Sequence, residues 1–229
     1  MKEITALILK YYSALARSLS RRIMRFYNHI TTRERDSSWY DRAFNAKYLL
    51  HYSDSPYYSM WQIIADRICE ADELGSDILD IGCGSAQISG LLHDIGVESY
   101  HGVDFSPKML EIAKANNPQY CFTLADLNDT KILENTPYDV VISTEFLEHI
   151  RADLPILREI RSGTKVYATV PNFSSMNHVR VFKTPRQVAS RYSEYFNGFK
   201  VDTINFSSEG VQCFLFEGVK KDTKGGINN

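Results

Sequence analysis

The sequence contains no apolar run close to the roughly 20 residues that a membrane-spanning helix needs. Basic residues interrupt every apolar stretch near the N-terminus, so no signal-peptide pattern is expected there. The four cysteines include no Cys-x-x-Cys pair, which excludes the spacing of a zinc knuckle and gives no sign of a disulfide framework. We therefore expect a reduced, cytoplasmic protein.

The chain also lacks an excess of basic residues. Its formal net charge is -2 and its pI is about 6.3. Nucleic-acid-binding domains usually carry a strong basic excess, so nucleic acid is disfavoured as a partner. The 229 residues with 44% hydrophobic content are enough for one sizeable core. Length and composition thus indicate one α/β domain with an extension.

Residues 1–30 contain neither glycine nor proline and show apolar residues at helical spacing. The opposite face of this predicted helix is basic, and its one acid is Glu3. Such a helix can make a peripheral contact with an anionic membrane surface. It can equally pack on its own domain or mediate dimerisation, and the sequence leaves these alternatives open.

An aromatic-rich, loop-like segment follows, and Pro56 suits the start of the next helix. That helix has an apolar face that includes Trp61 and Ile64, most simply as core. A further interpretation is that Tyr52, Tyr57 or Tyr58 lines the mouth of a ligand site. Residues 1–70 are therefore predicted to be an N-terminal helical extension or lid.

From residue 77, short apolar stretches alternate with helical patterns. This order predicts right-handed crossovers and a parallel sheet that is covered on both faces. Near the C-terminus only "SSEG" separates two strand patterns, which predicts an antiparallel pair at the sheet edge. The expected fold is α/β, a Rossmann-like, doubly wound, mostly parallel seven-stranded sheet with a C-terminal antiparallel pair. The strands are expected within residues 77–84, 99–106, 119–126, 138–144, 164–172, 199–206 and 211–219.

In such a sheet, ligands bind beyond the carboxyl ends of the strands. Asp80, Asp104, Asp126 and Glu145 are the first acids after four successive apolar runs. Each acid taken alone is also explained as a helix cap or a loop residue. Their occurrence at successive strand ends favours a shared ligand site.

The turn Gly82-x-Gly84 lets a ligand approach the backbone closely. The dinucleotide fingerprint needs another glycine three positions later, where this chain has Gln87, and this argues against NAD. Asp104 ends the next strand, where an acid accepts from ribose hydroxyls. Asp126 is placed to accept from an exocyclic amine. The pattern therefore suits a nucleoside without a diphosphate.

The motifs "ILDIGCGSA", "GVDFSPKMLEIA", "ADLND" and "YDVVISTEFLEHI" resemble, in order and spacing, those of class I S-adenosylmethionine-dependent methyltransferases. The resemblance covers residues 77–216, and a methyltransferase domain is expected over residues 71–219. The polar, glycine-containing residues 220–229 are expected to be a disordered tail. The resemblance implies S-adenosylmethionine as cofactor. The cofactor-binding residues that it implies are Asp80, Gly82 and Gly84 along the methionine, Asp104 on the ribose, Phe105 and Leu127 beside the adenine, and Asp126 on its amino group.

The segment Glu145-x-x-Glu148-His149 follows the fourth predicted strand. Residues i, i+3 and i+4 share one face of a helical turn, so their side chains are expected to lie together. His149 and Glu148 are the candidate catalytic residues, because an acceptor hydroxyl needs a base or a metal. The pattern is similar to that of ubiquinone-pathway O-methyltransferases and small-RNA 2′-O-methyltransferases. That similarity implies a metal site for Mg²⁺ or Mn²⁺ at Glu145, Glu148 and His149 with the later His178, and the choice between proton and cation stays open.

Residues 173–197 are expected to form part of the wall around the acceptor. Arg180, Lys183 and Arg186 are candidates for contact with an anionic group. A loose similarity of "PNFSSMNHVRVF" to bacterial glycan-modifying methyltransferases, together with the basic N-terminal helix, favours O-methylation of a sugar, a glycan or another small hydroxylated metabolite. An RNA ribose, a quinone or phenol, and a catalytically silent scaffold subunit are the alternatives. A location at the cytoplasmic face of a membrane is expected only if the first helix lies on lipid.

Overall fold

The computed structural model describes residues 33–43, 46–128, 131–206 and 210–222. The predicted basic helix of residues 1–30 lies outside the described residues, as does most of the predicted tail. Within the described part of the chain, no helix is both long enough and apolar enough to cross a membrane. All four cysteines are free thiols.

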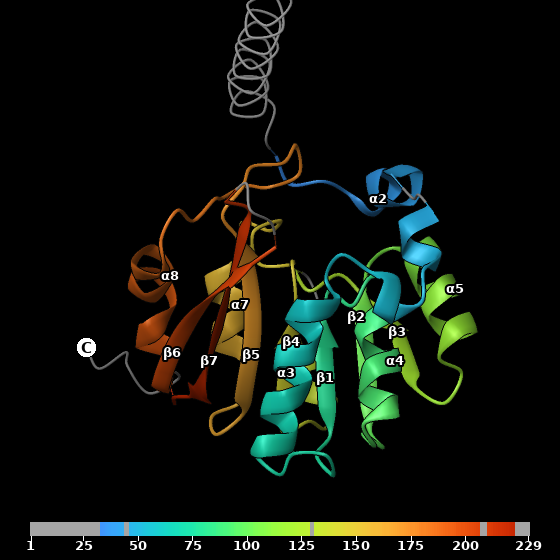
Figure 1. The fold of residues 1–229 in the computed structure, drawn as a ribbon, viewed down its shortest axis with the longest axis horizontal. Coiled ribbons are helices and arrows are strands. Elements are labelled where there is room, and N and C mark those ends of the chain that lie inside the picture. Colours follow the sequence, from blue (N-terminus) through green and yellow to red (C-terminus); the bar gives the residue numbers. More distant parts are fainter. Residues whose placement is uncertain (1–32, 44–45, 129–130, 207–209, 223–229) are drawn as a thin grey trace, which may run out of the picture.

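A seven-stranded sheet forms the centre of the molecule, in the order β3-β2-β1-β4-β5-β7-β6 (Figure 1). The first five strands are parallel, and β7 pairs antiparallel with both β5 and β6. The predicted α/β fold with its C-terminal antiparallel pair is therefore confirmed. The strands are β1 (Ile78–Ile81), β2 (Tyr100–Asp104), β3 (Cys121–Leu124), β4 (Val140–Ser143), β5 (Lys165–Pro171), β6 (Phe196–Asn205) and β7 (Gln212–Lys220).

Alternation of side chains along each central strand creates two hydrophobic cores, one on each face of the sheet. In β1, Ile78 belongs to one core and Leu79 to the other; in β4, Val140 and Val141 divide in the same way. These residues are almost fully buried. Burying one such aliphatic side chain stabilises the fold by about 1.5–3 kcal/mol. This two-sided burial explains why the central strands read as continuous apolar runs.

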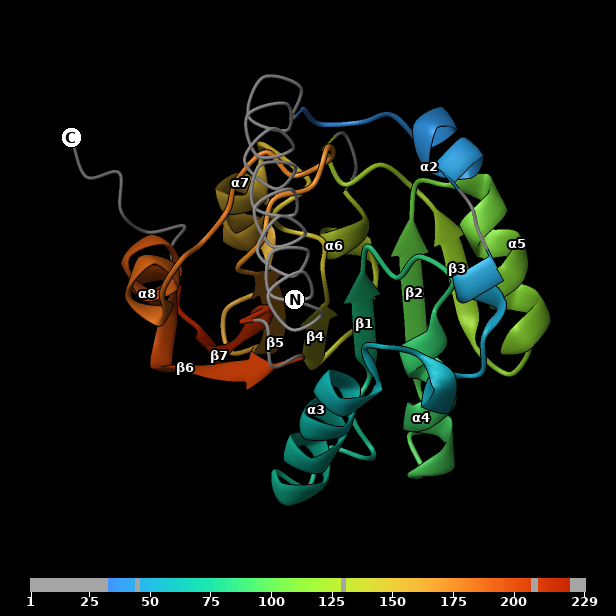
Figure 2. The same ribbon diagram turned by 45° about the horizontal axis from the view of Figure 1, so that its top comes forward.

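Helices cover both faces of the sheet, with α3 and α4 on one face and α7 on the other (Figures 1 and 2). Helix α5 has proline at its first position, Pro107, and Ser106 Oγ accepts a hydrogen bond from the Met109 backbone N–H. The helix predicted after Pro56 is displaced slightly and begins at Tyr58. The helices are α3 (Tyr58–Glu70), α4 (Gln87–Asp94), α5 (Pro107–Asn116), α6 (Ile132–Asn135), α7 (Asp153–Glu159), α8 (Pro185–Tyr192) and the 3₁₀ turn η3 (Ser193–Tyr195).

Residues 33–43 and 46–54 form a strap across the carboxyl ends of the strands (Figures 1 and 2). The strap contains α2 (Ser37–Ala43), η1 (Ala46–Leu49) and η2 (Tyr52–Asp54). It reaches the loops that follow β2, β3, β4 and β5 through hydrogen bonds. The strap therefore covers the end of the sheet at which the sequence places a ligand.

Candidate active site

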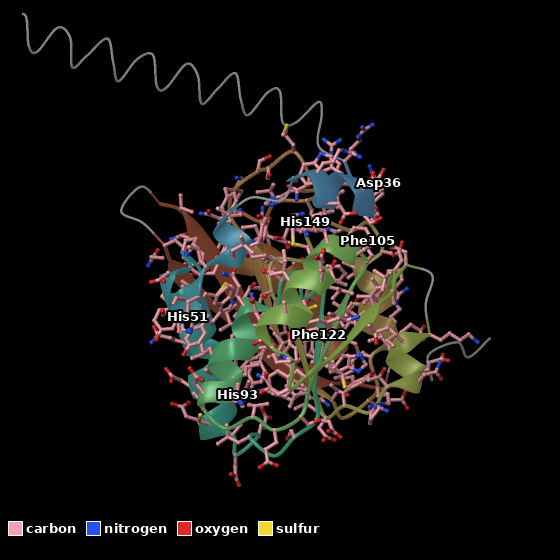
Figure 3. The ribbon with its side chains drawn as sticks, turned by 90° about the vertical axis from the view of Figure 1, so that its right-hand side faces the viewer. Asp36, His51, His93, Phe105, Phe122 and His149 are labelled. Carbon is pink, nitrogen blue, oxygen red and sulfur yellow. The ribbon has the colours of Figure 1, made fainter. Side chains whose placement is uncertain are left out.

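A cavity of about 840 Å³ lies between the strap and the carboxyl ends of the strands. Figure 3 shows Phe105 and His149 at the same end of the molecule as Asp36 of the strap, whereas His93 lies at the far end. The volume of the cavity is within the range of small-molecule sites. The walls of the cavity come from the strap, the start of α3 and the loops after β1 to β5. The cavity is therefore at the position that this sheet topology predicts for a ligand.

In the loop after β1, two glycines without side chains expose their backbone at the cavity wall. Gly82 has a φ of +75°, and an added Cβ would lie 2.3 Å from Cδ2 of Phe146. Gly84 has a φ of +54°, and its missing Cβ would meet nothing within 4 Å. Both positions need glycine for their backbone conformation. Gly82 also leaves room for Phe146, and Gly84 leaves the cavity open to a ligand.

Asp80 lies behind this loop rather than in the cavity wall. Its carboxyl group is 1% exposed, and its Oδ2 accepts a hydrogen bond of 2.6 Å from the Tyr100 hydroxyl. Burial raises the pKa of Asp80 to about 7, opposed by the Tyr100 hydrogen bond and assisted by the charge of Asp104. A ligand in the cavity can therefore reach Asp80 only through the loop after β1.

Asp104 lines the cavity at the end of β2. Its Oδ2 accepts from the Gly84 backbone N–H at 2.9 Å, and its Oδ1 accepts from the Ser106 N–H at 2.8 Å. These bonds fix the carboxylate plane, and each oxygen keeps lone-pair capacity for a further donor. Burial raises the pKa of Asp104, opposed by the two N–H groups. The group is thus a preorganised acceptor for a pair of hydroxyls.

Three further predicted residues line the same cavity next to Asp104. Phe105 follows it directly, and the Tyr40 ring of the strap packs edge-on against Phe105 at a centroid distance of 5.4 Å. Asp126 and Leu127 follow β3; Asp126 is exposed, and its Oδ1 accepts from the Asn128 backbone N–H at 2.9 Å. Apolar side chains and an exposed acid thus share one end of the cavity.

The loop after β4 does not form the helical turn that the sequence predicts. Glu145 has a left-handed φ of +53°, and no helix begins before Asp153. Its backbone N–H donates to Thr169 Oγ1 at 3.0 Å, and its Oε1 accepts from Cys213 Sγ at 3.1 Å. Burial raises the pKa of Glu145 to about 7. The expectation that Glu145 shares a helical face with Glu148 is therefore wrong, although Glu145 does line the cavity.

Glu148 is fully buried, with 0% exposure. Neither of its carboxyl oxygens has a hydrogen-bond partner among the described residues. Burial, with a contribution from Glu145, raises the pKa of Glu148 well above its ordinary range. His149 Nε2 lies 3.5 Å from Glu148 Oε1.

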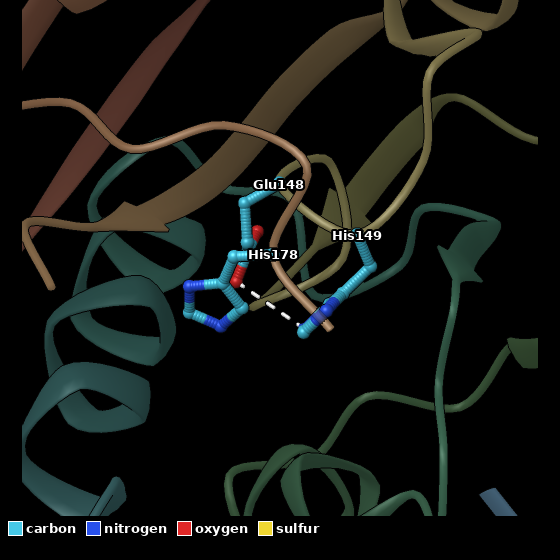
Figure 4. Close-up of side chains that lie close together, drawn as sticks. All are labelled: Glu148, His149 and His178. Atoms are coloured by element: carbon cyan, nitrogen blue, oxygen red, sulfur yellow. Dashed lines mark ion pairs between the residues drawn. The ribbon is translucent and has the colours of Figure 1, made fainter. Parts of the chain in front are cut away.

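His149 and His178 meet beside Glu148 although they lie 29 positions apart in the chain (Figure 4). Their ring centroids are 4.8 Å apart. Ligand atoms of these three residues all lie within 4.8 Å of one another. Burial lowers the pKa of both imidazoles, that of His149 to about 3. The predicted meeting of His178 with the loop after β4 is thus observed, and Glu145 does not belong to this group.

The basic residues that the sequence offers for an anionic ligand lie outside the cavity wall. Arg180 donates to the Leu147 and Ile150 carbonyls and forms an ion pair of 2.9 Å with Asp153. It thus secures the loop after β4 from behind. Lys183 Nζ donates to the Asn172 carbonyl at 2.9 Å. Arg186 is exposed on α8. None of these three side chains lines the cavity, so their contact with the acceptor stays a prediction.

The strap supplies cavity residues that sequence patterns do not single out. Tyr40 lies over His149 at a centroid distance of 6.1 Å, and its hydroxyl accepts from Asn177 Nδ2 at 3.3 Å. Tyr48 also lines the cavity. Of the tyrosines considered for the mouth, Tyr57 lines the cavity, whereas the Tyr52 hydroxyl donates to Asp94 and does not. The aromatic richness of the segment before α3 is the one sequence feature that could have indicated these cavity residues.

Comparison with known proteins identifies the domain. Residues 78–166 match the model of a family described as a methyltransferase domain. No curated protein matches the chain. Many solved structures share the fold. Magnesium protoporphyrin IX methyltransferase from Synechocystis with bound S-adenosylhomocysteine is 17% identical, with a TM-score of 0.57 over 72% of this chain and 84% of that one.

Two further solved structures show the same fold. The 1,6-didemethyltoxoflavin-N1-methyltransferase of Burkholderia thailandensis, bound to 1,6-didemethyltoxoflavin and S-adenosylhomocysteine, is 13% identical, with a TM-score of 0.56 over 71% of this chain and 78% of that one. A putative methyltransferase of Haloferax volcanii, in complex with the Trm112 methyltransferase activator, is 17% identical. Its TM-score is 0.54 over 72% of this chain and 96% of that one.

The doubly wound sheet with acids at successive strand ends has the fold of these solved methyltransferases, and residues 78–166 match a methyltransferase domain. The fold that the motifs imply is thus confirmed. Solved structures of this fold contain S-adenosylmethionine or S-adenosylhomocysteine, in agreement with the enzyme class and the cofactor that the motifs imply.

Proposed function

We propose that this methyltransferase transfers its methyl group to a hydroxyl oxygen of a sugar, a glycan or another small hydroxylated metabolite. The observation that carries the proposal is the buried group of Glu148, His149 and His178 beside the cavity. A sulfonium methyl group is already activated, and a neutral amine attacks it with little help. A hydroxyl group needs a base or a cation to become nucleophilic. Glu148, His149 and His178 can supply such a base or hold such a cation.

The cofactor is proposed to bind along the ends of β1, β2 and β3. The methionine part lies on the backbone of Gly82 and Gly84, with Asp80 supporting the loop from behind. The ribose hydroxyls donate to Asp104, whose oxygens are already oriented by backbone N–H groups. The adenine lies against the apolar and acidic end of the cavity, in contact with Phe105, Leu127 and Asp126.

The acceptor is proposed to occupy the remaining part of the cavity, at the ends of β4 and β5. The wall of the cavity includes the aromatic rings of Tyr57, Trp61 and Phe173 as well as the polar groups of Glu145 and His149. Flat apolar faces beside hydrogen-bonding groups suit a sugar ring or a hydroxylated ring system. The loop after β5, predicted from the sequence as part of the acceptor wall, contributes Phe173, as well as Ser175, Asn177 and His178.

His149 is proposed to take the acceptor proton through Nε2. Its Nδ1 lies 3.1 Å from the Asn177 carbonyl oxygen and donates to it, so Nε2 carries the lone pair. Glu148 Oε1 lies 3.5 Å from that nitrogen. The same residues also fit a divalent cation, because the buried Glu148 oxygens have no partner among the described residues. Such an ion lowers the pKa of a bound hydroxyl.

Of the four metal ligands that the sequence proposes for Mg²⁺ or Mn²⁺, the structure brings together three. Glu145 stands beside Cys213 and faces the cavity. We propose it as an acceptor contact, in which its carboxyl group meets a second hydroxyl of the acceptor. No specific observation favours a ribose in RNA or a quinone over the smaller acceptors.

A protein partner is a further proposal. The Haloferax volcanii methyltransferase of similar fold was solved in complex with an activator. No partner surface of the present chain follows from that likeness. The predicted contact of residues 1–30 with a membrane or a second subunit lies outside the described residues and stays a prediction.

A substrate screen tests the proposed function. The purified chain is incubated with methyl-labelled S-adenosylmethionine and a panel of sugar nucleotides, glycan extracts, catechols and amines. We expect label in methyl ethers of hydroxylated acceptors, sugars foremost. Labelling of amines alone would contradict O-methylation, and labelling of catechols without any sugar would contradict the acceptor class.

A further inference from the structure

Glu145 brings a carboxyl group to the cavity wall without a basic partner. Its Oε1 accepts from the Cys213 thiol at 3.1 Å, and it forms no ion pair with a described residue. The described residues of the loops after β4 and β5 contribute neither lysine nor arginine to the wall. The arginine and the lysine of the wall, Arg35 and Lys47, both belong to the strap. A charge on Glu145 is therefore left for a ligand to balance.

The carboxyl group of Glu145 responds to the charge of a ligand. Burial raises its pKa to about 7, opposed by hydrogen bonds with Cys213 and Thr169. A cation beside such a group favours the ionised form and lowers the pKa again. The resulting ion pair is stronger in a cavity than in water, because the cavity has a lower dielectric constant. This part of the wall therefore favours a cationic ligand and disfavours an anionic one.

Two aromatic rings lie on the same side of the cavity as this carboxyl group. Tyr57 and Trp61 both line the cavity, and their ring centroids are 6.0 Å apart. After burial, the charge of Glu145 is the largest cause of the raised pKa of Tyr57, so these two side chains are neighbours. Cys213, the hydrogen-bond donor to Glu145, packs in the same hydrophobic core as Trp61. The faces of aromatic rings attract cations, so rings and carboxyl group together suit an ammonium group.

We propose that Glu145, Tyr57 and Trp61 form a subsite for an ammonium group of the acceptor, which is then an amino alcohol such as an amino sugar. The ammonium group donates to Glu145 in the place of the second hydroxyl and lies against the two rings. The hydroxyl oxygen of the acceptor gives its proton to His149 and takes the methyl group of the sulfonium, which becomes the thioether of S-adenosylhomocysteine. Glu145 and His149 belong to one loop and both line the cavity, so one small molecule can reach both. The role of the cation as acceptor rests on the proposed function, whereas its binding stands on the three side chains alone.

The indole N–H signal of Trp61 in a nitrogen–proton NMR spectrum tests the subsite. The chain has two tryptophans, and Trp39 does not line the cavity, so its signal is an internal reference. The full chain, saturated with S-adenosylhomocysteine, is titrated near neutral pH with D-glucosamine and D-galactosamine, and with the neutral parent sugars glucose and galactose. We expect the Trp61 signal to shift saturably. The amino sugars should bind at least about 10-fold more tightly than their neutral parents, as for a hydrogen bond to a charged group.

Variants assign the preference to the named side chains. Glu145→Gln should reduce the preference for amino sugars to less than about 3-fold, and Tyr57→Leu should weaken their binding by about 3-fold or more. Asp66→Asn removes an exposed acid from α3, the helix of Trp61, and as the matched control should leave the preference unchanged. Calorimetry with S-adenosylhomocysteine shows which variants are folded. If Glu145→Gln does not fold, Tyr57→Leu and the comparison of the sugars still decide.

Four results would overturn the subsite. They are no shift of the Trp61 signal by either amino sugar, equal binding of amino and neutral sugars, an undiminished preference in Glu145→Gln, and a loss of S-adenosylhomocysteine affinity in Glu145→Gln as large as its loss of amino-sugar affinity. The last result would assign the carboxyl group to the ammonium group of the cofactor. Methyl label on amine nitrogens alone in the substrate screen would contradict O-methylation and leave the subsite standing. Methyl ethers of neutral sugars, without a Trp61 shift by amino sugars, would contradict the subsite and leave the proposed function standing.

Discussion

Gly82 and Phe146 are packed so closely that a Cβ on Gly82 would lie 2.3 Å from Cδ2 of the Phe146 ring. This contact joins the loop after β1, where the cofactor is proposed to bind, to the loop after β4, where the acceptor chemistry is proposed. A change on one side of the contact therefore displaces the other side as well.

Gly82→Ala is expected to disturb both loops, because the new methyl group clashes with Phe146 and the φ of +75° strains alanine. We expect a loss of about 1–3 kcal/mol in the free energy of unfolding. Affinity for S-adenosylhomocysteine, measured by calorimetry, should fall at least about 10-fold. Gly75→Ala is the control, since nothing lies within 4 Å of the added Cβ and its φ is not in the left-handed region. Unchanged cofactor affinity of Gly82→Ala would refute the proposed path of the methionine.

Asp104→Asn is expected to weaken S-adenosylhomocysteine binding by about 10- to 100-fold, because charge-assisted hydrogen bonds to a carboxylate contribute about 1.5–3 kcal/mol. The analogue without the ribose 2′-hydroxyl provides the specific control. Wild type should bind this analogue much more weakly than the parent compound, and Asp104→Asn should discriminate less. Equal discrimination by both proteins would show that Asp104 does not hold the ribose.

The stability of the chain should depend on pH through Asp80. Burial raises its pKa to about 7 from an ordinary value of 3.8. Between these values the unfolded chain releases the proton while the folded chain retains it, so the free energy of unfolding falls as pH rises. Asp80→Asn should therefore stabilise the protein by about 2 to 4 kcal/mol near pH 8, and by much less near pH 4.

Urea unfolding at both pH values measures this effect. Asp66→Asn on the exposed face of α3 is the control and should change stability by no more than about 0.5 kcal/mol at either pH. A stabilisation by Asp80→Asn that is equal at pH 4 and pH 8 would mean that ionisation of the Asp80 carboxyl group does not cause the stabilisation.

The strap should control how long the cofactor stays bound. Asp41 attaches α2 to the start of α5: its Oδ1 accepts from Ser106 Oγ at 2.6 Å and from the Lys108 backbone N–H at 3.3 Å. Asp41→Ala is expected to raise the dissociation rate of S-adenosylhomocysteine by about 3- to 10-fold, as for the loss of one or two hydrogen bonds. Stopped-flow measurement should show no such change for Asp54→Ala, whose side chain is exposed. Equal rates in Asp41→Ala and wild type would contradict a role of the strap.

The sheet could be predicted from the sequence because its strands are buried on both faces and separated by recognisable turns. Pro107 is the first residue of α5, and Gly96, with a positive φ, follows the end of α4. The proximity of Asp104 and Glu145 at one end of the sheet follows from the topology alone, since parallel strands present their carboxyl ends together.

The details of the loop after β4 could not be predicted in the same way. The spacing of Glu145 and Glu148 favours a helical turn, but tertiary contacts with Thr169 and Cys213 hold Glu145 in a left-handed conformation. Likewise, no local pattern places Tyr40 over His149, because the strap is positioned by contacts between segments far apart in the chain. The sequence also does not show that Asp80 faces away from the cavity.

A structure of the chain with bound S-adenosylhomocysteine tests the central claim most directly. The account predicts the ribose hydroxyls within hydrogen-bond distance of Asp104 and the sulfur atom directed toward Glu145 and His149. A ribose remote from Asp104, or a sulfur atom directed away from the loop after β4, would contradict it.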